Sequence, residues 1–387
     1  MAIPLAYNLR NLVVRKTTTL MTALGIALTV AVLLSILALV DGLRATLSSS
    51  GDPLQVLVTR KGATSELVSV VTRTQFQDLK FLPGIARSRD GQPLASLEVM
   101  TLINLASVDN PDGSNIIVRG LLPAGVEMRR RVRITSGRWF TPGRRELVAG
   151  RSVAQRFPGA RVGKRVLFGR SQWEIVGVMD TGSGAESSEI WGDLNQVSAD
   201  LNRVEYLSSA LLRATDEVTA KALINAVDGD RRFELRAQSQ REYFDEQTGS
   251  AAPIEYTGII VAVIMAIGSS FAAMSTMYAA VARRAREIGT LRVLGFSRFS
   301  ILCSFFVEGV LLSALGGLLG CVLVLPLNGV TTAVGGSNFA DLAFAFRLTP
   351  QILVAGVVFA VMLGSAGGLF PAGSAARKQI LTALREG

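Results

Sequence analysis

The chain has 387 residues, of which 49% are apolar and only 18% are charged, and its net charge is +10. This balance is more hydrophobic than that of a typical soluble protein. The chain contains no histidine, which removes the commonest metal ligand and the usual proton shuttle near neutral pH. The composition argues against a histidine-dependent enzyme or a metal site and favours a membrane protein.

The positive charge is unevenly distributed along the sequence. Residues 41–255 hold 28 Lys and Arg against 26 Asp and Glu, whereas the rest of the chain holds 12 against 4. The excess therefore lies beside the apolar stretches, where membrane proteins keep their cytoplasmic basic residues. This distribution argues against nucleic-acid binding.

Four long apolar stretches are each long enough to cross a membrane as a helix. The first, residues 17–40, carries no charge and would reach about 36 Å, against a hydrocarbon core of roughly 30 Å. The others are residues 256–282, residues 299–325 with Glu308 as their only charge, and residues 352–370. Helices buried in soluble cores rarely hold so many consecutive apolar residues. The sequence therefore predicts four transmembrane helices.

The first stretch has a competing interpretation as a signal peptide, because Arg10, Arg15 and Lys16 precede it. It is longer than the apolar region of a typical signal peptide. The residues after it, Asp41-Gly42-Leu43, do not form a small-x-small cleavage site. We therefore interpret residues 17–40 as an uncleaved anchor.

The orientation follows from the basic residues. Arginines and lysines gather in residues 1–16, 283–298 and 371–387, which lie on one side of the membrane if there are four spans. That side is expected to be cytoplasmic. Residues 326–351 are then an outer loop, and residues 41–255 are a large extracytoplasmic insert.

The insert is predicted to be an α+β domain between the first two spans, with turn signals such as Asp90-Gly91 and Asp112-Gly113 between its elements. A further helix is expected to begin at Ser239, which has capping-box spacing with Glu242, and to lead through Tyr243 and Phe244 as a stalk toward the second span. The predicted strands are Leu54–Thr59, Leu94–Ile103, Asn115–Arg119, Val166–Phe168 and Trp173–Val178, and the predicted helices are Thr74–Phe81, Gly192–Leu201 and Asp216–Val227.

The insert offers few signs of catalytic chemistry. No phosphate-binding loop occurs in the chain, and no pair of carboxylates stands out as acid and base. The run Arg129-Arg130-Arg131 with Arg133 could contact anionic headgroups or a partner, but a solvated basic face is the favoured interpretation. The two cysteines, Cys303 and Cys321, lie about 27 Å apart on a continuous helix, too far for a disulfide within the chain.

The most informative motif lies in the loop between the second and third spans. Residues 283–298 are predicted to form a short amphipathic helix at the cytoplasmic interface, with Ile288, Leu291 and Leu294 roughly on one face. A simple basic membrane anchor is the alternative. The Arg-Glu-Ile-Gly-x-Leu-Arg-x-Leu-Gly pattern at residues 286–295 resembles the signature of MacB/FtsX-type ABC transporter permeases.

The resemblance covers nearly the whole chain. One departure lies in the tail, where the family usually has a proline shortly after Ala-Arg and this chain reads Lys378-Gln379-Ile380. Further matching segments are Leu9–Leu12, Thr22–Leu28, Gly137–Phe140, Val162-Gly163, Trp173–Val178, Gly316-Gly317, Gly368–Ala372 and Ala383–Arg385.

The resemblance implies a non-catalytic permease subunit of the bacterial inner membrane that needs no cofactor of its own. ATP and Mg are expected in a separate ABC ATPase, whose hydrolysis would drive export or extraction outside by transmitted motion. The other implied partners are a second permease, identical or related, membrane lipids, and in a tripartite system an adaptor with an outer-membrane channel. The residues implied to contact the ATPase are Arg286, Glu287, Ile288, Gly289, Leu291, Arg292 and Gly295.

Polar and small residues inside the spans also stand out. Glu308 lies roughly ten residues into a span, where a carboxylate is costly unless it is paired or neutral. We expect it to bond to the backbone or to a basic residue at the cytoplasmic rim; a direct part in coupling or in substrate passage is the alternative. The two Gly-x-x-x-Gly pairs, Gly316/Gly320 and Gly364/Gly368, are expected to allow close helix packing.

Two other classes of function compete with the permease. The chain could be an ATPase-coupled signalling or regulatory protein that controls a periplasmic partner, or a membrane enzyme. No cytoplasmic segment is long enough for an output domain, and the enzyme lacks candidate catalytic residues. The sequence does not identify the substrate.

Overall fold

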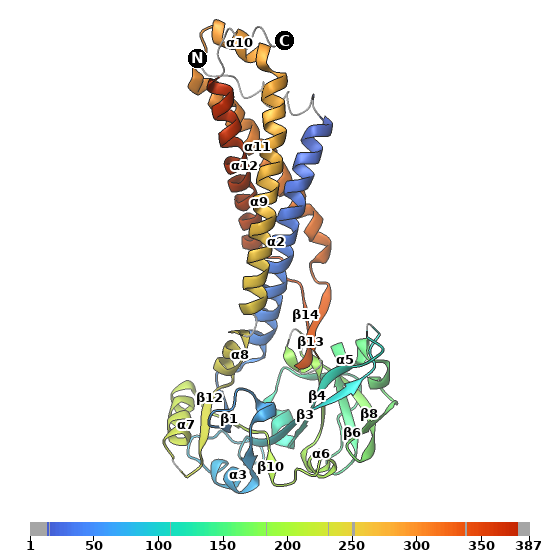
Figure 1. Cartoon of the computed structure of the whole chain (residues 1–387). Helices are drawn as coiled ribbons and strands as arrows, with labels where there is room; N and C mark the ends of the chain where they lie inside the picture. The colour runs from blue at the N-terminus through green and yellow to red at the C-terminus, as the bar shows by residue number, and fades with distance from the viewer. Residues whose placement is uncertain are drawn as a thin grey trace. The chain divides into compact units, whose positions relative to one another are not determined.

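Four long apolar helices dominate the computed structural model (Figure 1). They are α2 (Lys16–Ser50), α9 (Ala252–Arg283), α11 (Arg298–Val324) and α12 (Pro350–Arg377). Within the part of the chain that is described, these four are long and apolar enough to cross a membrane. The structure describes residues 14, 16–108, 110–182, 184–230, 232–249, 252–336 and 339–377.

The chain divides into two structural units. The helical unit comprises residues 1–42, 251–330 and 345–387, and the second unit comprises residues 43–250 and 331–344. The predicted fold class, four transmembrane helices with a large α/β domain between the first and second, is confirmed.

The helix ends differ most from the predicted spans in two places. Helix α2 continues past the predicted end at residue 40 as far as Ser50. Pro371, expected to flank the fourth span, lies inside α12. The predicted segment 1–16 lies almost wholly outside the described residues, and the predicted tail 371–387 is described only to residue 377.

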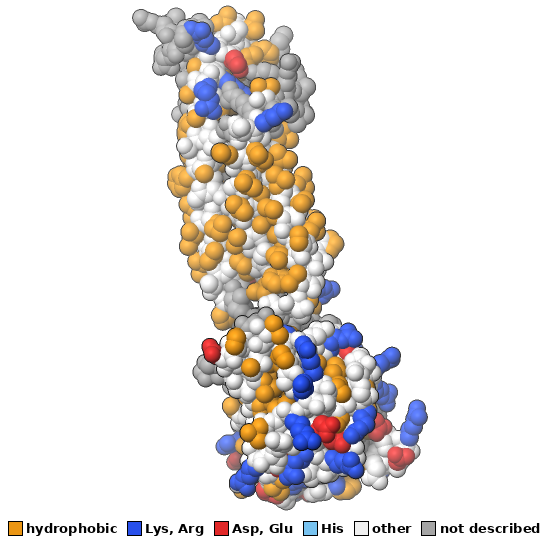
Figure 2. Space-filling view, turned by 90° about the vertical axis from the view of Figure 1, so that its right-hand side faces the viewer, with side chains coloured by type: hydrophobic (Ala, Val, Ile, Leu, Met, Phe, Trp, Pro, Cys, Tyr) orange, Lys and Arg blue, Asp and Glu red, His pale blue; other side chains and the backbone are white. Residues whose placement is uncertain are grey.

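Apolar packing joins α2, α11 and α12. Ile26, Val30 and Leu34 of α2 are buried in one cluster with Val324 of α11 and Ala360 of α12. Helix α9 is covered least, and its outward side chains include Ile260, Ile264 and Phe271, each more than half exposed. Figure 2 shows apolar side chains over the helical unit, as expected for a surface that faces lipid.

The second unit is built on a ten-stranded mixed sheet in the order β12-β1-β11-β3-β4-β9-β6-β8-β5, with β7 also paired to β8. Only the β4–β9 and β6–β8 pairs are parallel. The strands are β1 (Gln55–Arg60), β3 (Ala95–Leu105), β4 (Ser114–Leu121), β5 (Arg133–Gly137), β6 (Glu146–Gly150), β7 (Arg165–Phe168), β8 (Ser171–Asp180), β9 (Glu189–Asp193), β11 (Ser209–Arg213) and β12 (Leu235–Ser239), and a separate pair is β2 (Val71–Thr72) with β10 (Tyr206–Leu207).

All five predicted strands are present, as β1, β3, β4, β7 and β8, with ends shifted by one or two residues. The sequence missed β5, β6, β9, β11 and β12. The predicted helix Gly192–Leu201 begins two residues too early, because Gly192 and Asp193 end β9 and the Asp193 carboxylate caps the helix by accepting from the Gln196 amide.

Short helices cover the sheet, and side-chain caps fix several of their starts. Asp216 caps α7, and Thr72 forms a capping box with Gln75 at the start of α3. The buried core includes Trp173, Ile190 and Leu212. The helices are α3 (Arg73–Leu79), α4 (Pro123–Met128), α5 (Arg151–Arg156), α6 (Leu194–Asp200), α7 (Glu217–Gly229) and α8 (Gln240–Thr248).

The helix expected to form a stalk is α8, and its start is as predicted, since the Ser239 hydroxyl accepts from the Glu242 amide. Tyr243 is buried in a cluster with Leu57 and Met128 of the α/β domain. Helix α8 therefore packs as part of that domain and ends at Thr248, before α9 begins at Ala252.

The loop between the third and fourth spans contains a β-hairpin, β13 (Thr331–Gly336) with β14 (Phe339–Ala345). Residues 331–344 belong to the α/β unit. The amide of Ala343 donates a hydrogen bond of 2.9 Å to the Ser188 hydroxyl, and the Phe344 side chain is buried. The predicted outer loop is thus partly structured and docked on the domain.

Candidate coupling site

The loop between α9 and α11 folds into the short helix α10 (Ala285–Val293). Arg284 is its first flanking residue, with φ −101° and ψ 17°. Gly295 has φ +91°, a conformation that a side chain disfavours, and it lets the chain reverse after α10. Ser297 then caps α11 by accepting from the Ser300 amide. The predicted amphipathic helix is therefore present, between the non-helical residue Arg284 and the turn at Gly295.

A buried ion pair ties the start of this helix to the third span. The Arg284 guanidinium lies 2.9 Å from the Glu308 carboxylate, and the two side chains are only 3% and 12% exposed. The same guanidinium lies over the Phe305 ring, 5.8 Å from its centroid. One of the two predicted partners of Glu308, a basic residue at the end of a span, is thus found.

Glu287 contributes a second, weaker contact to Arg284, at 4.0 Å from its Nε. Its side chain is 58% exposed, so most of the carboxylate faces outward. Such an exposed contact at helical spacing contributes a few tenths of a kcal/mol.

Ile288 anchors the inner face of α10. It is 2% exposed and packs in a cluster with Val281, Ile301, Phe305 and Ala372. The expectation of a shared apolar face is right for Ile288 but wrong for Leu294, which is 66% exposed. At about 100° per residue, Leu294 lies about 120° around the helix from Ile288 and therefore faces away from the buried side.

The remaining predicted coupling residues divide between the two faces of α10. Gly289 is buried, and Leu291 and Arg292 are half-buried. The Arg292 Nη1 donates to the Phe296 carbonyl at 3.4 Å, while its Nε is buried without a partner. Arg286, Glu287 and Gly295 are exposed. The structure thus leaves a charged outer face that is held in place by an apolar inner face and an ion pair.

The paired glycines lie at helix contacts within the bundle. A Cβ on Gly316 would come within 2.9 Å of the Ala23 carbonyl, and one on Gly320 within 2.8 Å of the Ala27 carbonyl, both on α2. A Cβ on Gly364 would overlap the Ser313 side chain of α11. Gly368 has more room, with the Gly309 Cα 3.8 Å from its hypothetical Cβ.

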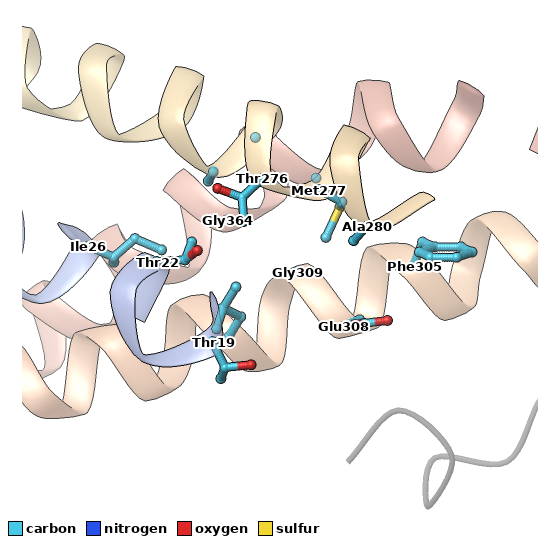
Figure 3. A pocket seen from close by; sticks show the side chains of 14 residues that line it. Thr19, Thr22, Ile26, Thr276, Met277, Ala280, Phe305, Glu308, Gly309 and Gly364 are labelled. Atoms are coloured by element: carbon cyan, nitrogen blue, oxygen red, sulfur yellow. The ribbon is translucent and has the colours of Figure 1, made fainter. Parts of the chain in front are cut away.

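A cavity of about 50 Å³ lies beside Glu308 within the bundle (Figure 3). Figure 3 shows the Glu308 and Phe305 side chains on α11, with Thr276 and Met277 on α9 facing the same space. All four helices contribute to its lining. No three His, Cys, Asp or Glu side chains among the described residues lie close enough to hold a metal ion. The cavity lies against the carboxylate of the Arg284–Glu308 pair.

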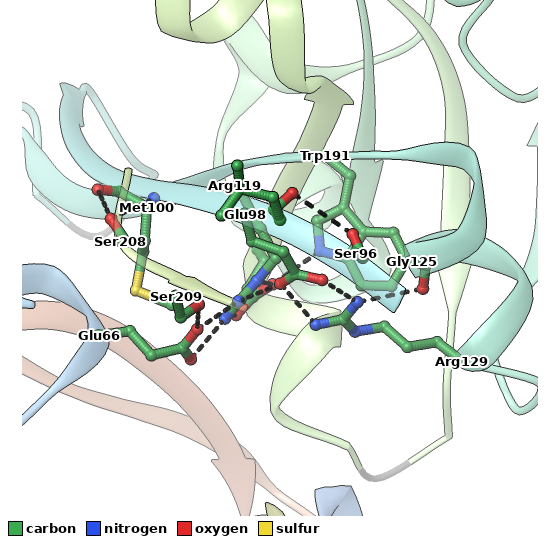
Figure 4. A network of polar contacts seen from close by, with 12 residues as sticks. Glu66, Ser96, Glu98, Met100, Arg119, Gly125, Arg129, Trp191, Ser208 and Ser209 are labelled. Atoms are coloured by element: carbon green, nitrogen blue, oxygen red, sulfur yellow. Dashed lines mark hydrogen bonds and ion pairs between the residues drawn. The ribbon is translucent and has the colours of Figure 1, made fainter. Parts of the chain in front are cut away.

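A second set of buried charges lies in the α/β domain, and the sequence did not reveal it. Arg119 of β4 pairs with Glu66, Glu98 and Glu189 at 2.9, 2.7 and 2.9 Å (Figure 4). Arg129 also pairs with Glu98, at 2.7 Å. The interpretation of the Arg129 run as a solvated face is therefore wrong for Arg129, which is 7% exposed, although Arg130, Arg131 and Arg133 are exposed.

Opposing effects act on the carboxylates of this network. Burial raises the pKa of Glu98, and Arg129 and Arg119 lower it further than burial raises it. Burial likewise raises the pKa of Glu189, and Arg119 brings it below its usual value. Each buried charge thus has a partner of opposite sign, and the network has the features of a structural core.

These features define a multi-pass membrane protein with a large α/β domain after its first span and a short, anchored helix between its second and third. Residues 19–229 match the MacB-like periplasmic core domain, and residues 259–380 match the FtsX-like permease C-terminal domain. The chain belongs to the MacB/FtsX-type family of ABC transporter permeases.

Relatives of known sequence agree with this assignment. The chain is 25% identical to the macrolide export ATP-binding/permease protein MacB of Pasteurella multocida, over 96% of this chain and 58% of that protein. It is 24% identical to the uncharacterized ABC transporter permease YknZ of Bacillus subtilis, over 97% of both. The crystal structure of the extracellular domain of a YknZ transporter aligns over 48% of this chain and 100% of that chain, with 16% identity and a TM-score of 0.36.

Proposed function

We propose that this chain is the transmembrane subunit of an ABC transporter and that α10 seats in a separate ATPase subunit. The observation that carries the proposal is the construction of α10. Its inner face is fixed by Ile288 and by the Arg284–Glu308 pair, while Arg286 and Glu287 face outward. A push on such a helix is passed to α11 through a buried charge contact, because separating the two charges is costly.

The ATPase would bind ATP and Mg, and this chain would convert the closure of that partner into movement of its helices. Two permeases, identical or related, would assemble with two ATPase subunits. The relatives include a macrolide exporter and a pyoverdine exporter, PvdT, by name. For this chain we propose export or extraction of a substrate outside the inner membrane, driven mechanically by the ATPase.

The proposal requires a defined topology, with the termini and residues 283–298 in the cytoplasm and the α/β domain outside. Cys303 and Cys321 are first replaced by serine, and single cysteines are then introduced at the exposed positions Arg89 and Thr290. Ser297 is avoided because its side chain caps α11. In intact spheroplasts, an impermeant thiol reagent should label only position 89. Labelling of position 290 under the same conditions would contradict the topology.

An assay of ATP hydrolysis tests whether the activity resides in the ATPase partner and not in this chain. The purified chain in nanodiscs should not hydrolyse ATP, because it has no phosphate-binding loop. Its complex with a co-purified ATPase should hydrolyse ATP, and a substitution of the phosphate-loop lysine in that ATPase should abolish the activity. Hydrolysis by the chain alone would overturn the proposal.

A further inference from the structure

The large sheet of the α/β domain has two edges, and they differ in how well they are protected. At β12, the Ala237 amide donates to the Asp228 carboxylate of α7 at 2.7 Å. At the opposite edge, β7 pairs with the start of β8 and β5 with its end, both on the side of β8 away from β6. Strand β5 carries a bulge between Ile134 and Ser136, a feature that interrupts pairing at an edge. The register of β7 is continuous, so β7 is the open part of this edge.

The alternation of hydrogen bonds along β7 shows which of its backbone groups face outward. A two-residue turn, residues 169–170, joins β7 to β8. The residues that flank such a turn bond to each other, and every second residue along the strand does the same. In agreement, the Ile175 amide of β8 donates to the Lys164 carbonyl at 2.9 Å. The even-numbered residues therefore bond to β8, and Arg165 and Leu167 direct their N–H and C=O groups to the free edge.

These outward backbone groups are open to solvent. Arg165 and Leu167 are both exposed, Leu167 at 75%, and no other described residue forms a hydrogen bond with their N–H or C=O groups. The register of the strand is fixed from within, because Val166 and Phe168 are buried in the core of the domain. A row of free N–H and C=O groups on a fixed strand is a template on which a further strand can pair.

The charge around this edge is strongly positive. Four exposed cations lie in residues 161–170, and none of them forms an ion pair with a carboxylate in the part of the chain that the structure describes. They are Arg161, Lys164, Arg165 and Arg170. Glu174 is the one carboxylate of residues 161–174, so four cations against one anion give this segment a net charge of +3. Two copies of such an edge repel each other, whereas an acidic strand is attracted.

We propose that β7 accepts an extended, acidic segment of another protein as an additional edge strand. Arg165 and Leu167 exchange backbone hydrogen bonds with this segment, which gives the affinity. Acidic side chains on the exposed face of the segment lie beside Arg165, and apolar side chains on its other face extend the layer formed by Val166 and Phe168. The site uses only residues of the α/β unit, so its test is independent of the α10 proposal.

The probe is a fluorescein-labelled peptide of about eight residues, in which glutamate alternates with valine. Fluorescence anisotropy measures its binding to the full chain in nanodiscs of zwitterionic lipid. The peptide should bind, and two matched peptides should bind about tenfold or more weakly. One has glutamine in place of glutamate, which removes the negative charges. The other is methylated on every backbone nitrogen, which keeps the charges and removes the amide donors.

Substitutions in the chain separate backbone pairing from charge. Leu167→Pro removes the outward N–H but no hydrogen bond to β8, and it should weaken binding about fivefold or more. Leu167→Ala is its matched control, because it also loses the leucine side chain but keeps the N–H. Arg165→Glu should weaken binding about tenfold or more, whereas Lys221→Glu, at an exposed position of α7, should leave it unchanged. Melting temperatures check the fold of each variant.

Hydrogen exchange gives a second measurement that needs no substitution. In the unaltered chain, the amides of Arg165 and Leu167 should exchange more slowly when the peptide is bound, because each then donates a hydrogen bond. The proposal is overturned if the glutamate–valine peptide does not bind or if exchange at these amides is unchanged. It is also overturned if the methylated peptide binds equally well, or if Leu167→Pro binds like Leu167→Ala, since attraction of charge alone would then explain the binding.

Discussion

The two buried arginine sites of this protein differ in how completely their charges are paired. In the α/β domain, Arg119 is held by three carboxylates at once. In the helical unit, Arg284 has one close carboxylate, Glu308, and only a distant contact with Glu287. The first arrangement stabilises a single packing of its domain. The second leaves one carboxylate exposed and rests on a single close contact, and it is the joint through which α10 is proposed to move α11.

The largest effect is expected from breaking the fully paired site. Arg119→Met leaves three buried carboxylates without their shared cation, so the α/β domain should lose about 3–5 kcal/mol of unfolding free energy. Chemical denaturation of the full chain, followed by tryptophan fluorescence, measures this loss because Trp191 donates to Glu189 in the same network. The exposed Arg133→Met should change stability by less than about 0.5 kcal/mol. Equal effects of the two substitutions would contradict the structural role of the network.

The next effect is expected at the joint. Arg284→Gln and Glu308→Gln should each destabilise the helical unit by about 2–4 kcal/mol, because each leaves one buried charge. The double substitution should cost less than the sum of the two by about 0.5–3 kcal/mol. Thermal unfolding in nanodiscs of the two single variants and the double variant gives this coupling energy. The exposed Arg283→Gln is the control, and strictly additive losses would show that the two charges do not interact.

A smaller effect is expected where α11 meets α2. Gly320→Leu forces a side chain against the Ala27 carbonyl and Val30, which should destabilise the bundle by about 1–3 kcal/mol. Gly268→Leu on α9 is the matched control, since a Cβ added there meets nothing within 4 Å. Melting temperatures of both variants in nanodiscs measure the two losses of stability. A loss at Gly268 as large as that at Gly320 would remove the argument for close packing.

The smallest effect is a dependence of the stability of the α/β domain on pH. The hydrogen bond from Arg138 is the main cause that lowers the pKa of Glu146 to about 2. Because the folded-state pKa is below the unfolded value of about 4.3, this contribution is present above that value and is lost as pH falls toward 2. Because Arg138 is half exposed, solvent screens the pair and its contribution to stability is small. Glu146→Gln should make the melting temperature depend less on pH between about pH 4.5 and 2.5. An unchanged slope of melting temperature against pH would contradict this.

Much of the architecture follows from the sequence because hydrophobic length and turn residues are local signals. The four apolar runs predicted α2, α9, α11 and α12, and β1 and β8 were visible as apolar strands. Strand β9 (Glu189–Asp193) was not, because its first residue is a carboxylate. That carboxylate is buried only because Arg119, distant in sequence, reaches it. A pattern within one segment cannot show such a partner.

The candidate coupling site could be predicted only in part, again from local signals. The motif located α10, and the period placed Ile288 on its inner face. Arg284 was indistinguishable from its neighbours Arg283 and Arg286 in sequence, although it alone of the three is buried. Its role depends on Glu308, which lies 24 residues later and meets it only after the chain reverses at Gly295. Long-range pairing again explains what the sequence left open.

The central claim is that the outer face of α10 contacts the ATPase, and Glu287→Ala tests it most directly. Glu287 is exposed and contributes little to folding, so the variant should insert and melt like the unaltered chain. Glu217→Ala, at an exposed helix start in the α/β domain, is the matched control. The measurement is ATP hydrolysis by the ATPase complex with each variant in nanodiscs, together with the stability of that complex. The account predicts that Glu287→Ala weakens the complex or removes the stimulation of hydrolysis by the permease, while Glu217→Ala does neither; unaltered values for Glu287→Ala would contradict it.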